Sequence, residues 1–286
     1  MSRESDIPGL EAVSVDVDGV RWHCRVGGEG PPVVLLHGWP ETGWTFRHVV
    51  PSLLRKRRVY VPDLPGWGAS DKPADYPYGV PDLVEKVPLF ARAAGIDGRF
   101  ALVGHDWGAA AAIFLTLRRP EILERAVWIN LGPELLSPFR PVHIWFMNLP
   151  LLPERVLARR PRGYLERIFR WWAADGTAFG PDVIDAYAAA FEAPGAREAT
   201  LRYYRSVRRM AAKALAGRLR GTATPRQVKV PLLVLWGDRD PIAPIDDAHA
   251  LARKIPSAIV QPILGAGHFP QEERPDQVIR AFDSFL

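Results

Sequence analysis

The sequence predicts an α/β fold, built on a mostly parallel sheet of eight strands. Short runs of β-branched and aliphatic residues alternate with stretches of helical periodicity over much of the 286 residues. Five of the eight runs are almost continuously apolar, which is typical of strands covered by helices on both faces. The alternation also favours parallel strands, because parallel neighbours need a crossover connection that is usually a helix.

The strands are expected at intervals along most of the chain. The first two flank Asp18-Gly19, a two-residue turn that strongly indicates a β-hairpin. Turn residues bound the later runs. The expected strands cover residues 13–17, 20–26, 32–38, 58–64, 100–106, 125–130, 231–237 and 258–264.

Helices are expected between the later strands and at the end of the chain. Residues 45–56 carry an apolar face, residues 80–94 follow, and residues 107–118 are rich in alanine. Pro275 suits the first turn of a last helix, because the first helical position needs no backbone N–H donor.

Residues 132–224 interrupt the alternation of strand and helix. They contain no good strand, are rich in Pro, Arg and Trp, and indicate helices near 151–160, 162–174, 182–192 and 196–216. The sequence therefore predicts one core domain made of residues 1–131 and 225–286. A helical domain of residues 132–224 is inserted into it after the sixth strand.

The charge of the chain is concentrated in this insertion. The whole sequence has 37 Lys and Arg against 32 Asp and Glu, a net charge of +5 that raises nucleic acid as a partner. Residues 132–224 hold fifteen of the basic and eight of the acidic residues. Solvated helix faces explain this excess best, so no nucleic-acid partner is predicted. Steering of an acidic substrate is a weaker alternative.

Other compositional features exclude several classes of site. Cys24 is the single cysteine, which excludes an internal disulfide and a multi-cysteine metal centre. No metal cluster stands out, and neither a metal nor a cofactor is expected. No signal-peptide core or transmembrane stretch is recognisable. The expectation is a cytoplasmic protein without a membrane span, either a monomer or a homodimer.

Candidate catalytic residues follow the strands, where open α/β sheets place their sites. Gly104-His105-Asp106-Trp107-Gly108 joins the fifth strand to the alanine-rich helix. The flanking glycines allow strand and helix to approach closely, so that Asp106 can occupy a sharp turn as an exposed nucleophile. The alternative is an Asp106 that merely caps the helix.

Three further strand ends carry polar motifs. His37-Gly38-Trp39-Pro40-Glu41 follows the third strand, and its loop can aim the Trp39 amide at the same point as the Trp107 amide, forming an oxyanion hole. Asp238 and Asp240 follow the seventh strand, and His268 follows the eighth. The order nucleophile, acid, histidine argues against an incidental arrangement.

These motifs resemble those of the α/β-hydrolases, and most closely the epoxide hydrolases, which are related to the haloalkane dehalogenases. The resemblance extends from about residue 12 to the end of the chain, and it implies that the insertion is a cap over the site. It favours Asp240 over Asp238 as the acid that orients His268. Some relatives place this acid after the sixth strand, where this chain has the neutral Asn130. The motifs are HGWPE (37–41), DLPGWGAS (63–70), GHDWG (104–108), LWGDRD (235–240) and GAGHF (265–269).

An aspartate nucleophile suits displacement at a saturated carbon. Its carboxylate is ionised at neutral pH and attacks without a base, giving a covalent alkyl–enzyme ester. His268 would then activate a water molecule to hydrolyse the ester, while the amides of Trp39 and Trp107 stabilise the oxyanion. The expected substrates are a small-molecule epoxide and water.

The leaving group decides between the two activities. An epoxide leaves as an alkoxide and needs a proton donor. Tyr204, in the segment LRYYR, resembles the ring-opening tyrosine of the epoxide hydrolases, and His143, in HIWF, resembles the partner donor. Most epoxide hydrolases have a tyrosine in place of His143. The predicted substrate-binding residues are Trp39, Trp107, His143, Trp145, Phe146 and Tyr204.

The alternative function is that of a haloalkane dehalogenase, in which Trp107 and Trp145 could bind the halide. The cap also resembles that of fluoroacetate dehalogenases. Those enzymes carry arginines after the nucleophile, where this chain has Trp107 and Ala110, and this difference disfavours fluoroacetate as a substrate.

Overall fold

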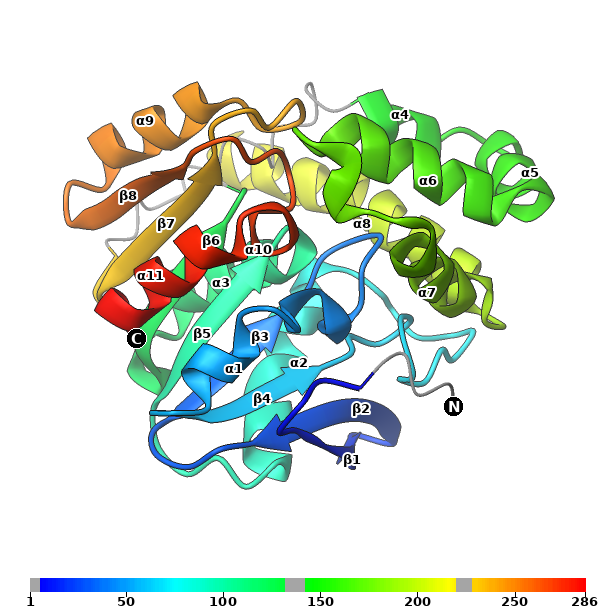
Figure 1. Cartoon of the computed structure of the whole chain (residues 1–286). Coiled ribbons are helices and arrows are strands. Elements are labelled where there is room, and N and C mark those ends of the chain that lie inside the picture. Colours follow the sequence, from blue (N-terminus) through cyan, green and yellow to red (C-terminus); the bar gives the residue numbers. More distant parts are fainter. Residues whose placement is uncertain (1–5, 132–141, 220–227) are drawn as a thin grey trace.

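An eight-stranded sheet forms the centre of the protein (Figure 1). The computed structural model describes residues 6–131, 142–219 and 228–286. The strand order is β1-β2-β4-β3-β5-β6-β7-β8. Strands β1 (Glu11–Val17) and β2 (Val20–Gly27) form the predicted antiparallel hairpin, and β2 is also antiparallel to β4 (Arg58–Pro62). The other pairs are parallel and involve β3 (Pro32–Leu36), β5 (Phe100–His105), β6 (Leu123–Ile129), β7 (Leu232–Gly237) and β8 (Ala258–Ile263). The predicted fold class is therefore confirmed.

Helices cover both faces of the sheet. In β3, Val34 and Leu36 belong to the same apolar core as helices α2 (Val80–Ala93), α3 (Trp107–Arg118) and α9 (Ile245–Lys254). Val33 and Leu35 pack on the other face, with α1 (Val50–Leu53) and α11 (Pro275–Phe285). Successive strand residues point to opposite faces, so a strand covered on both sides is apolar at every position.

Two parts of the core differ from the expectation. The helix predicted over residues 45–56 is divided into the 3₁₀ turn η2 (Gly43–Phe46) and the short α1. Pro51 explains the division, because proline fits the first turn of a helix but not its interior. Helix α9 was not expected, although Asp246 and Asp247 in its first turn and Arg253 and Lys254 in its last complement the helix dipole.

The helical insertion predicted after the sixth strand is present. Its helices lie beyond the carboxyl ends of the central strands (Figure 1). The predicted limits at residues 132 and 224 fall outside the described residues. Among the described residues, no helix is both long and apolar enough to span a membrane. The insertion contains α4 (Val142–Met147), α5 (Leu152–Arg159), α6 (Pro161–Trp172), the 3₁₀ turn η5 (Gly176–Ala178), α7 (Pro181–Glu192) and α8 (Ala196–Leu219). The remaining core elements are η3 (Pro120–Ile122) and α10 (Pro270–Glu273).

Candidate active site

Asp106 occupies a strained turn between β5 and α3. Its backbone angles are φ 49° and ψ −113°, and a positive φ is costly for a residue with a side chain. The Asp106 side chain makes no capping hydrogen bond to α3, so the capping alternative gains no support. A Cβ atom at Gly108 would lie 2.1 Å from the carbonyl oxygen of Leu36, and one at Gly104 would lie 2.3 Å from that of Gly108. Both glycines are therefore required by close backbone contacts.

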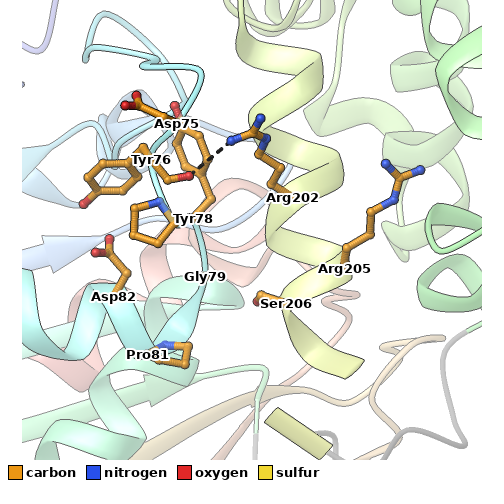
Figure 2. A pocket seen from close by; sticks show the side chains of 10 residues that line it. Asp75, Tyr76, Tyr78, Gly79, Pro81, Asp82, Arg202, Arg205 and Ser206 are labelled. Atoms are coloured by element: carbon orange, nitrogen blue, oxygen red, sulfur yellow. Dashed lines mark hydrogen bonds between the residues drawn. The ribbon is translucent and has the colours of Figure 1, made fainter. Parts of the chain in front are cut away.

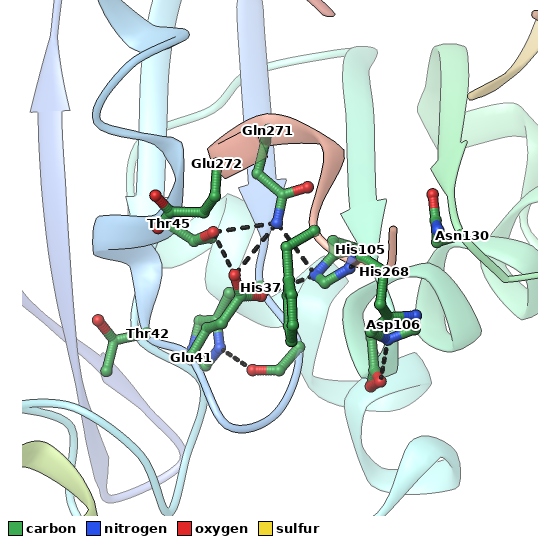
Figure 3. Close-up of polar contacts among 12 residues, drawn as sticks. His37, Glu41, Thr42, Thr45, His105, Asp106, Asn130, His268, Gln271 and Glu272 are labelled. Carbon is green, nitrogen blue, oxygen red and sulfur yellow. Dashed lines mark hydrogen bonds and ion pairs between the residues drawn. The ribbon is translucent and has the colours of Figure 1, made fainter. Parts of the chain in front are cut away.

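His268 lies between two carboxylates, one of which, that of Asp106, is seen beside it in Figure 3. Its Nδ1 is 2.8 Å from Oδ2 of Asp240, and its Nε2 is 3.3 Å from Oδ2 of Asp106. Asn130 donates from Nδ2 to the same Asp240 oxygen at 2.6 Å. Asp238 instead accepts the backbone N–H of Gly265 through Oδ1. The structure thus brings together Asp106, Asp240 and His268.

The two carboxylates decide the charge of His268. Its ring is buried, and burial opposes a positive charge. The negative charges of Asp240 and Asp106 outweigh this effect and raise the pKa of His268 to about 10. In the resting site at neutral pH, His268 is therefore an imidazolium.

The loop after β3 passes directly against the nucleophile. A Cβ atom at Gly38 would lie 2.3 Å from Cβ of Asp106. Burial lowers the pKa of His37, and its Nε2 accepts the Leu64 N–H at 2.9 Å. The ring proton therefore resides on Nδ1, which donates to the Gly38 carbonyl at 2.8 Å. His37 thus holds the peptide unit that carries the Trp39 amide.

A small cavity adjoins the nucleophile, and residues of the insertion close it. The Tyr204 hydroxyl is buried and has no hydrogen-bond partner among the described residues. The His143 ring lies edge-on to the Tyr204 ring, with 5.6 Å between the two ring centroids. Burial raises the pKa of Tyr204 far above its ordinary value and lowers that of His143 to about 4, so both are neutral at pH 7. The cavity of about 50 Å³ is lined by Asp106, Trp107, Ala110, Leu131, His143, Ile144, Tyr204, Val207, Ile242 and His268.

The remaining expected binding residues do not line this cavity. Trp39 is buried beside it, with its ring edge-on to Tyr204 at 5.5 Å. Phe146 stacks loosely on Tyr164, with the centroids 6.3 Å apart. Trp145 is 55% exposed, because α4 turns it away from the face that carries His143. The expectation that Trp145 contacts the substrate therefore finds no support in its position.

Several residues at the cavity were missed by the sequence reasoning. Val207 follows Tyr204 by three positions on α8, a spacing that places both on one helix face. Ile242 follows Asp240 closely in the loop after β7. Trp172 is fully buried, with its ring centroid 4.7 Å from that of His143 and 5.2 Å from that of His268. The sequence indicates Trp172 only as one of many aromatic residues of the insertion that imply an apolar pocket, because its partners His143 and His268 are distant in the sequence.

A larger cavity, of about 500 Å³, lies between α8 and the loop that leads into α2 (Figure 2). Arg202 donates to the carbonyl oxygen of Tyr76 across it at 3.4 Å. It contains none of Asp106, Asp240 and His268. Cavity volume alone would therefore point away from the residues that can do chemistry.

Comparison with known proteins identifies the family. The family model described as "alpha/beta hydrolase fold" matches residues 31–275. The chain belongs to the α/β-hydrolase fold family. Relatives of this hydrolase carry different activities in their names. It is 27% identical over 277 residues to the soluble epoxide hydrolase of Corynebacterium sp. (strain C12), covering 92% of each chain.

Two further relatives have a similar sequence identity to this chain, although one of them is named for a different activity. A fluoroacetate dehalogenase of Burkholderia sp. is 28% identical over 293 residues, which cover 97% of this hydrolase and 94% of that protein. The crystal structure of Cfl2 from Burkholderia cenocepacia is 30% identical, with a TM-score of 0.83 over 97% of this chain and 96% of that one. An epoxide hydrolase and a dehalogenase are almost equally similar, so the substrate must be argued from the site.

A buried polar cluster of Glu41, Thr45, His105 and Gln271 lies next to Asp106 and His268 (Figure 3). His105 Nδ1 lies 2.8 Å from Oε2 of Glu41, and His105 Nε2 lies 2.8 Å from the carbonyl oxygen of His268. Gln271 donates to Thr45 Oγ1 at 3.0 Å and lies within 3.3 Å of His105 Nδ1. His105, the residue before the nucleophile, is therefore bonded to the backbone of His268.

Proposed function

We propose that this α/β-hydrolase is an epoxide hydrolase that converts an epoxide and water into a vicinal diol. One observation carries the proposal: the Tyr204 hydroxyl is buried at the cavity that Asp106 lines, and its proton has no acceptor among the described residues. An unpaired buried hydroxyl is costly unless a ligand pairs with it. An epoxide oxygen needs such a donor as it leaves, whereas a halide leaves without one. The similarity to the Corynebacterium soluble epoxide hydrolase supports the same activity.

The first step opens the ring. A carboxylate oxygen of Asp106 attacks an epoxide carbon, the carbon–oxygen bond of the ring breaks, and an alkyl–enzyme ester forms. Tyr204 donates its proton to the oxygen that leaves. Since the raised pKa keeps Tyr204 protonated, the donor is present over the whole physiological pH range. His143, which is neutral, is proposed as the second donor.

The second step hydrolyses the ester. Formation of the ester removes the charge of Asp106, one of the two charges that raise the pKa of His268. This pKa therefore falls, His268 gives its proton to the Tyr204 oxygen and so restores the hydroxyl, and the neutral imidazole can act as a base. Its Nε2 takes a proton from the water that attacks the ester carbonyl, while the Trp39 and Trp107 amides hold the oxyanion. The alkyl oxygen then leaves with the proton from His268, which releases the diol, and the carboxyl proton left on Asp106 passes to His268, which restores the resting site.

The two parts of the chain divide these roles. The proposed core, residues 1–131 and 225–286, supplies the nucleophile, the acid, the histidine and the oxyanion amides. The proposed cap, residues 132–224, supplies His143 from α4 and Tyr204 from α8. In this proposal the nucleophile comes from the core and the proton donors come from the cap.

A trapping experiment tests the function. His268→Ala, incubated with styrene oxide or cyclohexene oxide, is expected to gain the mass of one epoxide on the peptide that contains Asp106. The control His268→Ala/Asp106→Asn should gain none. Bromoalkanes are tested in parallel with the wild-type protein. Bromide release without adducts or diols from epoxides would replace the proposal with the haloalkane dehalogenase activity.

A further inference from the structure

Glu273 binds the backbone on both sides of His268. It lies in α10, five residues after the histidine, and is 5% exposed. Its Oε1 accepts the N–H of Gly267 at 3.0 Å and that of Phe269 at 3.1 Å. One carboxylate thus holds the backbone N–H groups of both residues that flank His268.

The same carboxylate holds the segment that follows α6 in the cap. Oε2 of Glu273 accepts the N–H of Ala174 at 2.7 Å and that of Asp175 at 3.3 Å. The carbonyl oxygen of Trp172, the last residue of α6, accepts the N–H of His268 at 2.8 Å. The loop that carries the histidine is therefore bonded to the cap through its own backbone and through Glu273.

The backbone at Gly267 is in tight contact with the segment that follows α6. A Cβ atom at Gly267 would lie 2.4 Å from both the Trp172 carbonyl oxygen and the Ala174 nitrogen. A carboxylate has about four acceptor sites, and four backbone donors occupy them here. Glutamine would fit poorly at position 273, because its NH₂ group would face two N–H donors whichever way the amide is turned.

We infer that Glu273 is a positioning residue for ester hydrolysis, which aligns His268 with Asp106 and Asp240 and ties this alignment to the end of α6. The inference rests on the proposed function, which assigns His268 to the second step. Asp106 is held independently, by the β5–α3 turn. Glu273 should therefore affect hydrolysis of the ester but not its formation.

Single-turnover kinetics with an epoxide separate the two steps. In Glu273→Gln, ester hydrolysis is expected to slow by about tenfold or more, since small misplacements of a catalytic group are costly. Ester formation should stay within about twofold of the wild-type rate. The matched control is Asp238→Asn, a carboxylate that accepts the Gly265 N–H in the same loop but touches neither neighbour of His268. Both of its rates should be those of the wild type.

A second measurement needs no substrate. The proton between His268 Nδ1 and Asp240 is expected to give a far-downfield ¹H NMR signal, which should shift or broaden in Glu273→Gln but not in Asp238→Asn. Glu273→Asp serves in the same way if the Gln variant does not fold. An unchanged signal with unchanged hydrolysis overturns the inference, as does a parallel loss of both steps and of thermal stability. A wild-type protein that forms no ester refutes the proposed function alone, and the NMR comparison still tests Glu273.

Discussion

Tyr203 and Tyr204 are adjacent on α8 but lie in different surroundings. The Tyr203 hydroxyl donates to the carbonyl oxygen of Pro65 at 3.1 Å, and its ring stacks on Trp67 with 4.0 Å between the centroids. The Tyr204 hydroxyl has no partner in the described part of the chain and belongs to a side chain that lines the cavity with Asp106. One tyrosine therefore stabilises the fold, and the other leaves its hydroxyl free for a ligand.

Replacing each hydroxyl should give opposite results. Tyr204→Phe is expected to lower kcat for epoxide hydrolysis by about 100-fold or more without loss of stability, because it removes a proton donor that has no acceptor among the described residues. Tyr203→Phe should keep near-normal activity and lose about 1 kcal/mol of unfolding free energy with its hydrogen bond. Steady-state kinetics and urea denaturation of both variants check this. The reverse pattern would exclude Tyr204 as the donor.

At the scale of elements, the β5–α3 unit depends on backbone contacts that only glycine permits. α3 begins directly after Asp106 and packs against β3, where Gly108 meets the Leu36 carbonyl. The Gly108 N–H donates to the carbonyl oxygen of His37 at 3.0 Å. The strand β5, the helix α3 and the loop after β3 are thus held against one another around Asp106.

A methyl group at this contact should separate the elements. Gly108→Ala is expected to cost about 3 kcal/mol or more in unfolding free energy, because the new atom would overlap backbone that cannot rotate away. Gly163→Ala is the control, since Gly163 lies in α6 with open space around it. It should leave stability unchanged or raise it by up to about 1 kcal/mol. Equal stabilities of the two variants in denaturant titrations would contradict this packing argument.

At the scale of the whole molecule, a buried acid joins the helical insertion to the rest of the protein. Glu272 Oε1 accepts from Tyr187 of α7 and from Arg47 of the core, both at 2.5 Å. His48 Nε2 lies 3.9 Å from Oε2 of Glu272. The negative charge of Glu41 repels that of the Glu272 carboxylate. Burial, with the Glu41 charge, outweighs Arg47 and raises the pKa of Glu272 to about 7.

This raised pKa makes stability depend on pH. The folded protein keeps the Glu272 proton to about pH 7, whereas the unfolded chain releases it near pH 4.5, so the contribution to stability falls as pH rises through this window. Between pH 5 and pH 8, Glu272→Gln should gain roughly 2 to 3 kcal/mol relative to the wild type. Urea denaturation of both proteins at each pH measures this difference. Parallel stability curves would show that Glu272 keeps an ordinary pKa.

Local patterns account for much of the fold and for part of the site. The hairpin at Asp18-Gly19 and the buried runs of β5 and β7 follow from turn chemistry and continuous apolarity, which the sequence displays directly. The division at Pro51 was missed because the apolar face continues across it. The face of α4 that meets the core could not be assigned without the helix itself, so Trp145 was expected in the cavity.

Other features depend on contacts that no local pattern encodes. The turn after β7 places Asp240 rather than Asp238 against His268, because Asp240 Oδ1 also accepts the N–H groups of Ile242 and Ala243. Spacing alone did not separate the two acids, and family resemblance was needed. The bond between Glu273 and Ala174 joins residues about a hundred positions apart, so only the folded chain reveals it.

The backbone contact at Gly267 has a consequence for engineering. Cap exchange between related hydrolases is an attractive route to new substrates, because it treats the pocket as a separate module. Here a grafted cap would also bring a new surface against the backbone beside His268, where a Cβ atom already has no space. A chimera would therefore need residues 267–273 transferred together with the segment that follows α6.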